Sequence, residues 1–337
     1  LQDSGAGTED TILSTSASNL AVTAGGVTIG ADGQLTMNAS TITVNGSWNS
    51  SAGSIVRGTS TVIFAVSGNL TMVATNIAES LYNVTVNSAV TLTNLTNTAW
   101  ISNVLTVNGT LLGGSPNDPQ MTLFVSGESG SNMLVLGGLA DVDSSGYLIL
   151  RARGASGSTY TIPAAVYQHL GLQGGNLTFS YTMNLGGNIS TPLCGVYNNC
   201  AILMSSEATG TPAANFTVNT NNFSITAGGT LWIGDGTTTG VTFNAGSSVI
   251  EARGLNPAGD NVIVNFSTAT VTVHPSSIED PLAFYSTYNS RVNFNSSNVT
   301  VHGGMRLGWG TGVTSIFDLG SATITVTDNE GISCGTG

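Results

Sequence analysis

The chain has 337 residues, with 6 arginines, no lysine and 18 acidic residues, which gives a formal net charge of −12. The scarcity of basic residues excludes the positive stripe that binds DNA or RNA phosphates, and the negative charge disfavours an anionic membrane surface. Hydrophobic residues make up 40% of the chain and are regularly spaced, which predicts a folded core and not disorder.

Short strands are predicted from one end of the chain to the other. The runs alternate apolar and polar residues with period two, and Gly, Asn, Asp or Ser separates them. They are Leu35–Met37, Thr41–Val44, Thr61–Phe64, Val84–Val86, Val90–Leu92, Val262–Val264, Ala269–Val273 and Ala322–Val326. Thr11–Leu13 is a further strand signal near the first residue. No apolar run reaches the ~18–20 residues that span a bilayer, so no membrane span is predicted.

One segment departs from this pattern. Residues 162–171 read as a short helix, with Pro163 in the first turn and Gly171 as its end. We therefore expect a first β-solenoid segment over residues 1–155, a short helical interruption over 156–175 and a second β-solenoid segment over 176–337. Together they would form one continuous body.

Imperfect repeats set the predicted fold. Residues 19–26 (NLAVTAGG) return as 222–229 (NFSITAGG) and, more loosely, as 298–304. Residues 51–58 resemble 245–254 and 145–154. Such repeats are typical of solenoids, in which each coil buries its apolar face against the next. The prediction is an all-β protein, a right-handed parallel β-helix, and the alternative is a set of tandem β-sandwich domains.

The three cysteines indicate the redox state of the compartment in which the protein is found. Cys194 and Cys200 are separated by Gly and Asn residues that suit a turn, which predicts a local disulfide and an oxidising compartment. The alternative is two unpaired core residues. Cys334 is left over, either to join a neighbouring subunit or to remain a buried thiol. The chain begins with Leu1, from which we expect a processed product.

Fourteen Asn-x-Ser/Thr sequons are candidate glycosylation sites. On a strand, Asn and Ser/Thr share the outer face while the middle residue points inward, which exposes the asparagine. The alternative is that they form unmodified Asn and Thr ladders on a solenoid face. The candidates are Asn38, Asn45, Asn49, Asn69, Asn83, Asn94, Asn108, Asn176, Asn188, Asn215, Asn222, Asn265, Asn295 and Asn298.

Candidates for metal and catalytic chemistry are few. Asp141 and Asp143 begin a D-x-D-x-S-G stretch that could hold calcium, but the twelfth position is Ala152, so we favour a plain Asx turn and expect no other cofactor. Glu279-Asp280 is an acidic pair that a turn before Pro281 explains equally well. His169, His274 and His302 show no metal-ligand spacing. We therefore expect no enzyme; a polysaccharide-active enzyme is the weakest alternative.

The asparagine–apolar–Ser/Thr strands, the Ala-Gly-Gly turns and the near absence of charge carry a resemblance over the whole chain. The sequence resembles the secreted, Ser/Thr/Gly/Asn-rich β-solenoid surface proteins of bacteria and archaea, among them extracellular filament subunits and adhesin stalks. This resemblance implies an extracellular or cell-surface structural role. We expect a filament subunit that assembles head to tail with copies of itself through its terminal strands. The alternative is a monomeric adhesin, stalk or glycan-binding module, with surface glycans as partners.

Overall fold

The computed structural model describes residues 11–15, 19–72, 79–96, 98–113, 122–130, 132–175, 179–192, 201–206, 215–234, 240–275, 282–287, 289–309, 314–327 and 331–334. The chain divides into two compact units, unit 1 (1–128 and 132–150) and unit 2 (129–131 and 151–337). Strand β16 (Tyr147–Ala152) contains the division.

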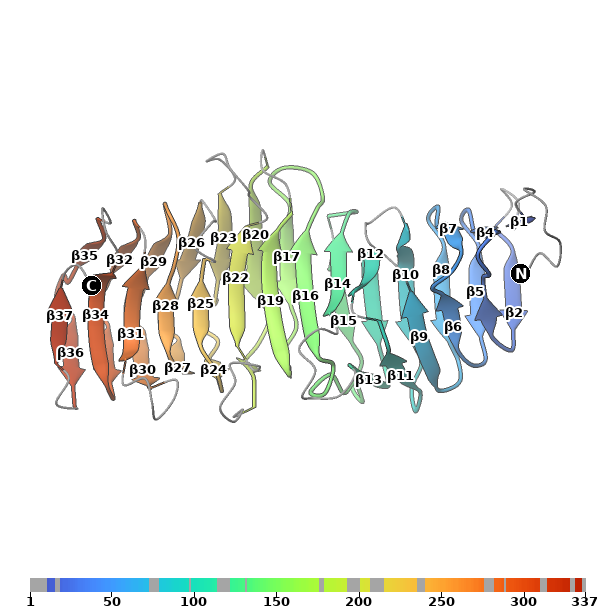
Figure 1. Cartoon of the computed structure of the whole chain (residues 1–337). Helices are drawn as coiled ribbons and strands as arrows, with labels where there is room; N and C mark the ends of the chain where they lie inside the picture. The colour runs from blue at the N-terminus through green and yellow to red at the C-terminus, as the bar shows by residue number, and fades with distance from the viewer. Residues whose placement is uncertain are drawn as a thin grey trace. The chain divides into compact units, whose positions relative to one another are not determined.

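Unit 1 is built from parallel strands that stack into three hydrogen-bonded columns (Figure 1). Column A contains β1 (Thr11–Ser14), β4 (Gly33–Thr36) and β7 (Ser54–Val56). Column B contains β2 (Ala21–Ala24), β5 (Thr41–Val44), β8 (Thr61–Phe64), β10 (Leu81–Val86), β12 (Thr98–Val107) and β14 (Thr122–Gly127), with β15 (Leu134–Leu136) also paired to β12. Column C contains β3 (Val27–Thr28), β6 (Trp48–Ser50), β9 (Gly68–Met72), β11 (Thr91–Asn94) and β13 (Thr110–Leu112).

Unit 2 repeats this arrangement. Column D contains β17 (Thr159–Ile162), β20 (Tyr181–Leu185), β23 (Phe216–Asn219), β26 (Val241–Asn244), β29 (Ile263–Asn265), β32 (Arg291–Asn293) and β35 (Ile316–Asp318). Column E contains β18 (Ala165–Val166), β21 (Ile189–Ser190), β24 (Ile225–Ala227), β27 (Val249–Arg253), β30 (Thr270–His274), β33 (Asn298–Val301) and β36 (Thr323–Val326). Column F contains β19 (His169–Gly174), β22 (Ile202–Ser206), β25 (Leu231–Ile233), β28 (Leu255–Pro257), β31 (Leu282–Thr287), β34 (Gly304–Trp309) and β37 (Ile332–Cys334).

The predicted fold class, an all-β parallel β-helix, is confirmed. Alternation explains it, because every second side chain of a strand points into the coil and the others point outward. In column B, Val44, Phe64, Val86 and Val107 stack in register, and all are fully buried. Each such side chain contributes about 1.5–3 kcal/mol of burial free energy, so the stacked inner positions form the core.

Corners between strands use residues that tolerate the left-handed region. Asn38 has a φ of 50° and Gly58 has a φ of 54°. A Cβ at Gly58 would collide with the backbone of Asn38 in the adjacent coil. Corners in neighbouring coils therefore stack closely, which glycine allows because it has no side chain.

The predicted helix over residues 162–171 is wrong. This stretch forms the end of β17, all of β18 and the start of β19. Tyr160 and Ile162 point inward and are buried, and Pro163 follows them at a corner. The Tyr167 hydroxyl, also buried, donates to the Pro163 carbonyl over 2.7 Å, which closes this corner without a helix.

Among the described residues there is no helix long and apolar enough to cross a bilayer.

Candidate functional site

The open ends of the two units are the first candidate site. At the N-terminal open coil (β1, β2 and β3), each strand pairs with a partner on one side only within the described residues. The core is uncovered there, because Val22 aligns with the buried Ile42 yet is itself only half-buried. A cavity of about 370 Å³ lies at this end, and its apolar lining includes Leu13, Leu20, Val22, Ile29 and Leu35.

The C-terminal open coil (β35, β36 and β37) shows the same features. Ile324 and Val326 align with Val299 and Val301, which are 1% and 0% exposed. Ile324 and Val326 are nevertheless half-buried, since no described strand covers them. Ile332 on β37 is 56% exposed, and Ile12 on β1 at the opposite open coil is 60% exposed. In the described part of the chain, both ends therefore present apolar side chains beside strand edges that lack a second partner.

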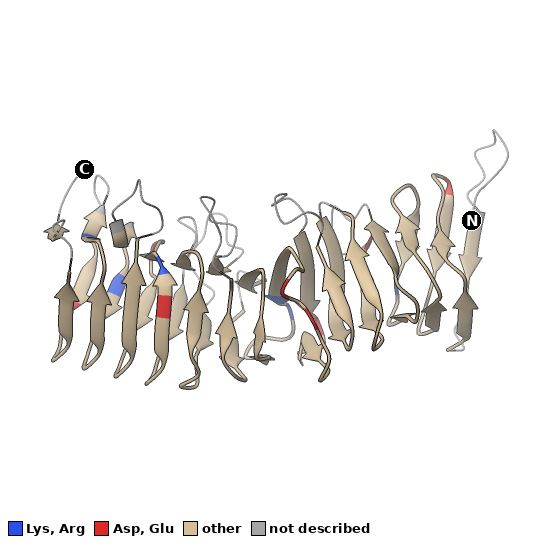
Figure 2. Ribbon diagram, turned by 90° about the horizontal axis from the view of Figure 1, so that it is seen from below, with Lys and Arg blue, Asp and Glu red and all other residues tan. Residues whose placement is uncertain are grey.

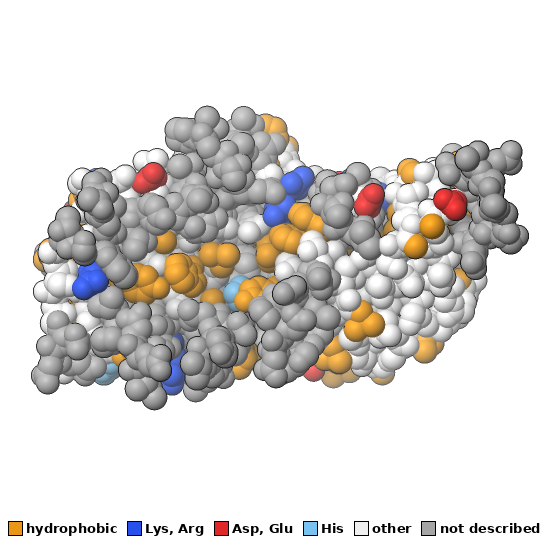
Figure 3. All heavy atoms as spheres, in the orientation of Figure 1, with side chains coloured by type: hydrophobic (Ala, Val, Ile, Leu, Met, Phe, Trp, Pro, Cys, Tyr) orange, Lys and Arg blue, Asp and Glu red, His pale blue; other side chains and the backbone are white. Residues whose placement is uncertain are grey.

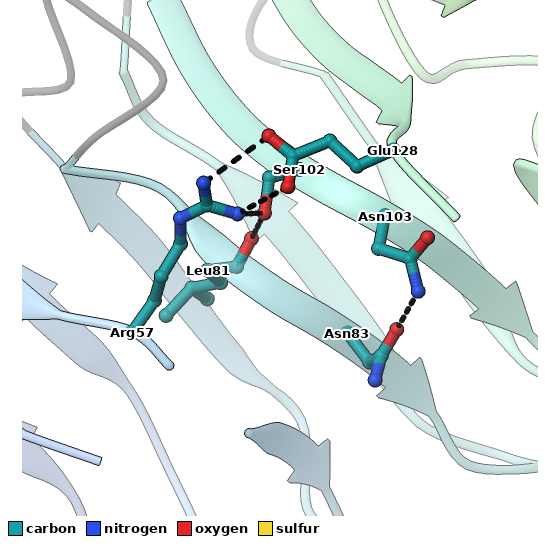
Figure 4. A network of polar contacts seen from close by, with 6 residues as sticks. All are labelled: Arg57, Leu81, Asn83, Ser102, Asn103 and Glu128. Atoms are coloured by element: carbon teal, nitrogen blue, oxygen red, sulfur yellow. Dashed lines mark hydrogen bonds and ion pairs between the residues drawn. The ribbon is translucent and has the colours of Figure 1, made fainter. Parts of the chain in front are cut away.

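A charged network crosses several coils of unit 1 (Figure 4). The Arg57 guanidinium forms two hydrogen bonds to the Glu128 carboxylate, at 2.9 and 3.1 Å, and it also donates to the Ser102 hydroxyl. Ser102 in turn donates to the Leu81 carbonyl over 3.2 Å. Nearby, Asn103 donates to the Asn83 side chain over 2.8 Å. These contacts connect the segment after β7 with β10, β12 and the end of β14.

An asparagine ladder runs along column D of unit 2. Each side-chain amide donates to the Oδ1 of the preceding asparagine over 2.7–2.9 Å, and all five side chains are half-buried. Arg291 donates to the Oδ1 of the last one over 3.1 Å. The ladder consists of Asn184, Asn219, Asn244, Asn265 and Asn293. It is a structural array with no free acid or base, so it carries no chemistry of a catalytic kind.

Two of the three histidines lie together. The rings of His274 and His302 are parallel, with centroids 4.9 Å apart, and Glu251 lies 3.4 Å from the first ring. His302 Nδ1 lies 3.0 Å from the Thr327 hydroxyl. His169 belongs to another column and is buried. Spacing in the sequence did not reveal the pair. His274 ends β30 and His302 directly follows β33, and each comes after a Val-Thr-Val run that the coils bring into register.

The sequon asparagines fall into four groups. One group is exposed: Asn45, Asn69, Asn188, Asn215, Asn222, Asn295 and Asn298. A second is half-buried: Asn38, Asn49, Asn83, Asn108 and Asn265. Asn94 is buried, and Asn176 lies outside the described residues. The predicted outward Asn with an inward middle residue occurs on β9, β10 and β33 but is reversed at Asn94.

Asp141 and Asp143 are both exposed, and the Asp143 amide donates to Asp141 Oδ1 over 3.2 Å, as in an Asx turn. A hydrogen bond with Asp141 and partial burial raise the pKa of Asp143. Within the described ranges, no three His, Cys, Asp or Glu side chains gather in a way that could hold a metal ion. Four other candidate residues lie outside these ranges: Cys194, Cys200, Glu279 and Asp280. Cys334 is described, and it is a free, exposed thiol.

Neither a family of proteins, nor a curated protein, nor a solved structure matches this chain.

Proposed function

We propose that the chain is the structural subunit of an extracellular filament and that its copies join head to tail through their open coils. The proposal is supported by the two end coils, in each of which three parallel strands pair on one side only within the described residues and carry half-buried core positions. An unpaired strand edge is a template for another strand, and a solenoid without a polar cap is expected to stack.

Head-to-tail contact follows from strand direction. Parallel pairing continues only if the C-terminal open coil of one copy meets the N-terminal open coil of the next. Two different surfaces are then in contact, and such an interface repeats without closing. Val22 and Ile324 would become buried in the joint, as their counterparts Ile42 and Val299 are in the interior.

The test uses one blocked end at a time. Val22→Asp places a carboxylate in the N-terminal open coil, and Ile324→Asp places one in the C-terminal open coil. Both positions are half-buried in the free chain, so folding should survive, but burying an unpaired charge in the joint costs several kcal/mol. The matched controls are the outward neighbours, Thr23→Asp and Thr325→Asp.

Light scattering should show that each blocked variant stays monomeric and that an equal mixture of the two forms dimers only. The outward controls should still polymerise. Dimers of Ile324→Asp alone would mean contact between two N-terminal ends, and long polymers from either blocked variant would refute the proposed joint. Deleting residues 1–18, which removes β1, should also abolish polymerisation.

N-glycosylation of this subunit is part of the proposal, and the exposed sequons support it best. Asn222 and Asn298 present their side chains to solvent, whereas Asn265 uses its amide nitrogen as a ladder donor. We therefore expect glycans at exposed sequons and an unmodified Asn265. Mass spectrometry of peptides from the native source tests this, and a glycan on Asn265 with none on Asn222 or Asn298 would contradict it.

A further inference from the structure

The outer face of column F carries a row of large side chains that the assembly proposal does not use. Its outward positions in successive coils are Leu203, Trp232, Asn256, Tyr285 and Arg306, hereafter the aromatic row. Figure 3 shows hydrophobic side chains gathered along this face of unit 2. In column B of unit 1, the outward positions are instead held mainly by threonines such as Thr43, Thr85 and Thr106.

Two aromatic rings lie one coil to either side of Asn256. Trp232 and Tyr285 are both half-buried, and their rings meet edge to face with centroids 6.2 Å apart. Rings of this kind have apolar faces and a polar edge, so they bind partners that are themselves amphipathic. A sugar ring, with an apolar face and a rim of hydroxyls, has that character.

Asn256 gives an independent indication of a ligand. Its side chain is only 1% exposed, and Oδ1 has no hydrogen-bond partner. The asparagines of column D, by contrast, are paired along the ladder. An unpaired buried acceptor costs about 1–3 kcal/mol, and a ligand that brings a hydroxyl donor to it would recover that energy.

Charge limits the class of ligand. The chain carries −12 overall and has no lysine, and Arg306 is the one cation of the aromatic row. A polyanion would be repelled by the chain as a whole, whereas a neutral polymer would not. The row therefore suits a hydroxyl-rich, uncharged ligand.

We propose that the aromatic row binds a neutral polysaccharide. Sugar rings stack on Trp232 and Tyr285, and binding turns one ring aside so that a sugar hydroxyl donates to Asn256 Oδ1. This site is independent of filament assembly, which uses the ends of the columns and not their outer faces.

The test is a fluorescence and calorimetric titration of the full chain with soluble neutral β-glucan, mannan and galactan, and with polygalacturonate as the acidic comparison. At least one neutral polymer should bind and change the tryptophan emission. Trp232→Ala and Tyr285→Ala should each weaken that binding about tenfold, as the loss of an anchoring aromatic side chain does. Thr85→Ala and Thr106→Ala, on column B, should leave it unchanged.

Asn256→Leu separates binding from a structural role. If the amide serves the ligand, the variant should bind weakly yet unfold at the same or a higher temperature, because an unpaired acceptor has been removed. A lower unfolding temperature with unchanged binding would overturn the assignment. So would the absence of binding by every neutral polymer, binding only of polygalacturonate, or equal affinity after Trp232→Ala and Tyr285→Ala.

Discussion

The charged network of unit 1 and the asparagine ladder of unit 2 connect coils with different polar groups. In unit 1, Arg57 reaches Glu128 through a bidentate charged pair, whereas in unit 2 five asparagines form a chain of amide hydrogen bonds. A guanidinium has only donors and a carboxylate only acceptors, so such a pair cannot pass a hydrogen bond on to an identical pair in the next coil. An amide has both, so each asparagine donates to one neighbour and accepts from the other. Only the amide hydrogen bond can therefore be repeated from one coil to the next.

This difference explains the composition of the chain. Equivalent positions on stacked parallel strands lie ~4.8 Å apart, so a charged residue repeated along a column would face a like charge on both sides. Asparagine, serine and threonine have no such penalty. The ribbon accordingly carries few charged residues (Figure 2), and the repeating outer positions of columns B and D are mainly hydroxyls and amides.

The largest expected difference between the units is in their response to alkali. Burial raises the pKa of Tyr160 and of Tyr167, and burial and the neighbouring Tyr160 raise the pKa of Tyr181 to about 12. All three lie in unit 2, whereas in unit 1 burial raises the pKa of Tyr147. A raised tyrosine pKa means that the neutral phenol stabilises the fold. That stability is complete below pH 10 and is lost as the pH rises from 10 through about 12.

Tyrosinate absorbance and circular dichroism, followed together, check this prediction. The buried tyrosines should ionise only as the strand signal is lost, and Tyr181→Phe should reduce the steepness of the loss. Ionisation near pH 10 with the strand signal intact would contradict it.

The second effect concerns the ladder itself. Asn244→Ala removes two amide hydrogen bonds and leaves Asn219 Oδ1 and the Asn265 amide without their partners. We expect a loss of about 2 kcal/mol in the free energy of unfolding, measured by urea denaturation. Asn298→Ala, at an exposed asparagine of column E, is the matched control and should change it by less than about 0.5 kcal/mol. If both variants lost the same free energy of unfolding, the ladder would add nothing to the stability of the fold.

The smallest effect is expected for the charged pair. The side chains of Arg57 and Glu128 are 20% and 28% exposed, so solvent screens their attraction. Arg57→Met should cost about 1 kcal/mol, and 1 M salt should remove most of that difference. The double variant Arg57→Met/Glu128→Gln should show no such salt dependence, whereas the Asn244→Ala deficit should persist at every salt concentration. If the stability deficit of Asn244→Ala also fell with salt, the proposed difference between the ladder and the charged pair would be wrong.

Alternation was enough to predict the strands. Thr41–Val44, Thr61–Phe64 and Ala322–Val326 correspond to β5, β8 and β36. It was not enough to place them in columns, because every column requires the same alternation. The repeat copies at 222–229 and 298–304 both lie in column E. The sequence repeat aligns Ile225 with Val301, but in the column Ile225 occupies the same position as Val299. The repeat is thus offset by two residues from the structural register.

The missed features depend on this register. The helix over residues 162–171 was predicted because proline, glycine and apolar residues at helical spacing fit a helix and a tight β-corner alike. The asparagine ladder and the His274–His302 pair become visible only when coils are aligned, since their members are 21–35 residues apart. The two end coils that no further described strand covers contain the strand signals at Thr11–Leu13 and Ala322–Val326, which are visible in the sequence.

The most direct test of the proposed assembly is electron microscopy of the chain as isolated from its native source. We expect fibres one subunit wide, with an axial repeat of one subunit and a ~4.8 Å strand spacing that continues through each joint. Extra density at exposed sequons such as Asn222 would locate glycans in the same images. Dispersed single subunits, or pairs joined through two identical ends, would contradict head-to-tail assembly.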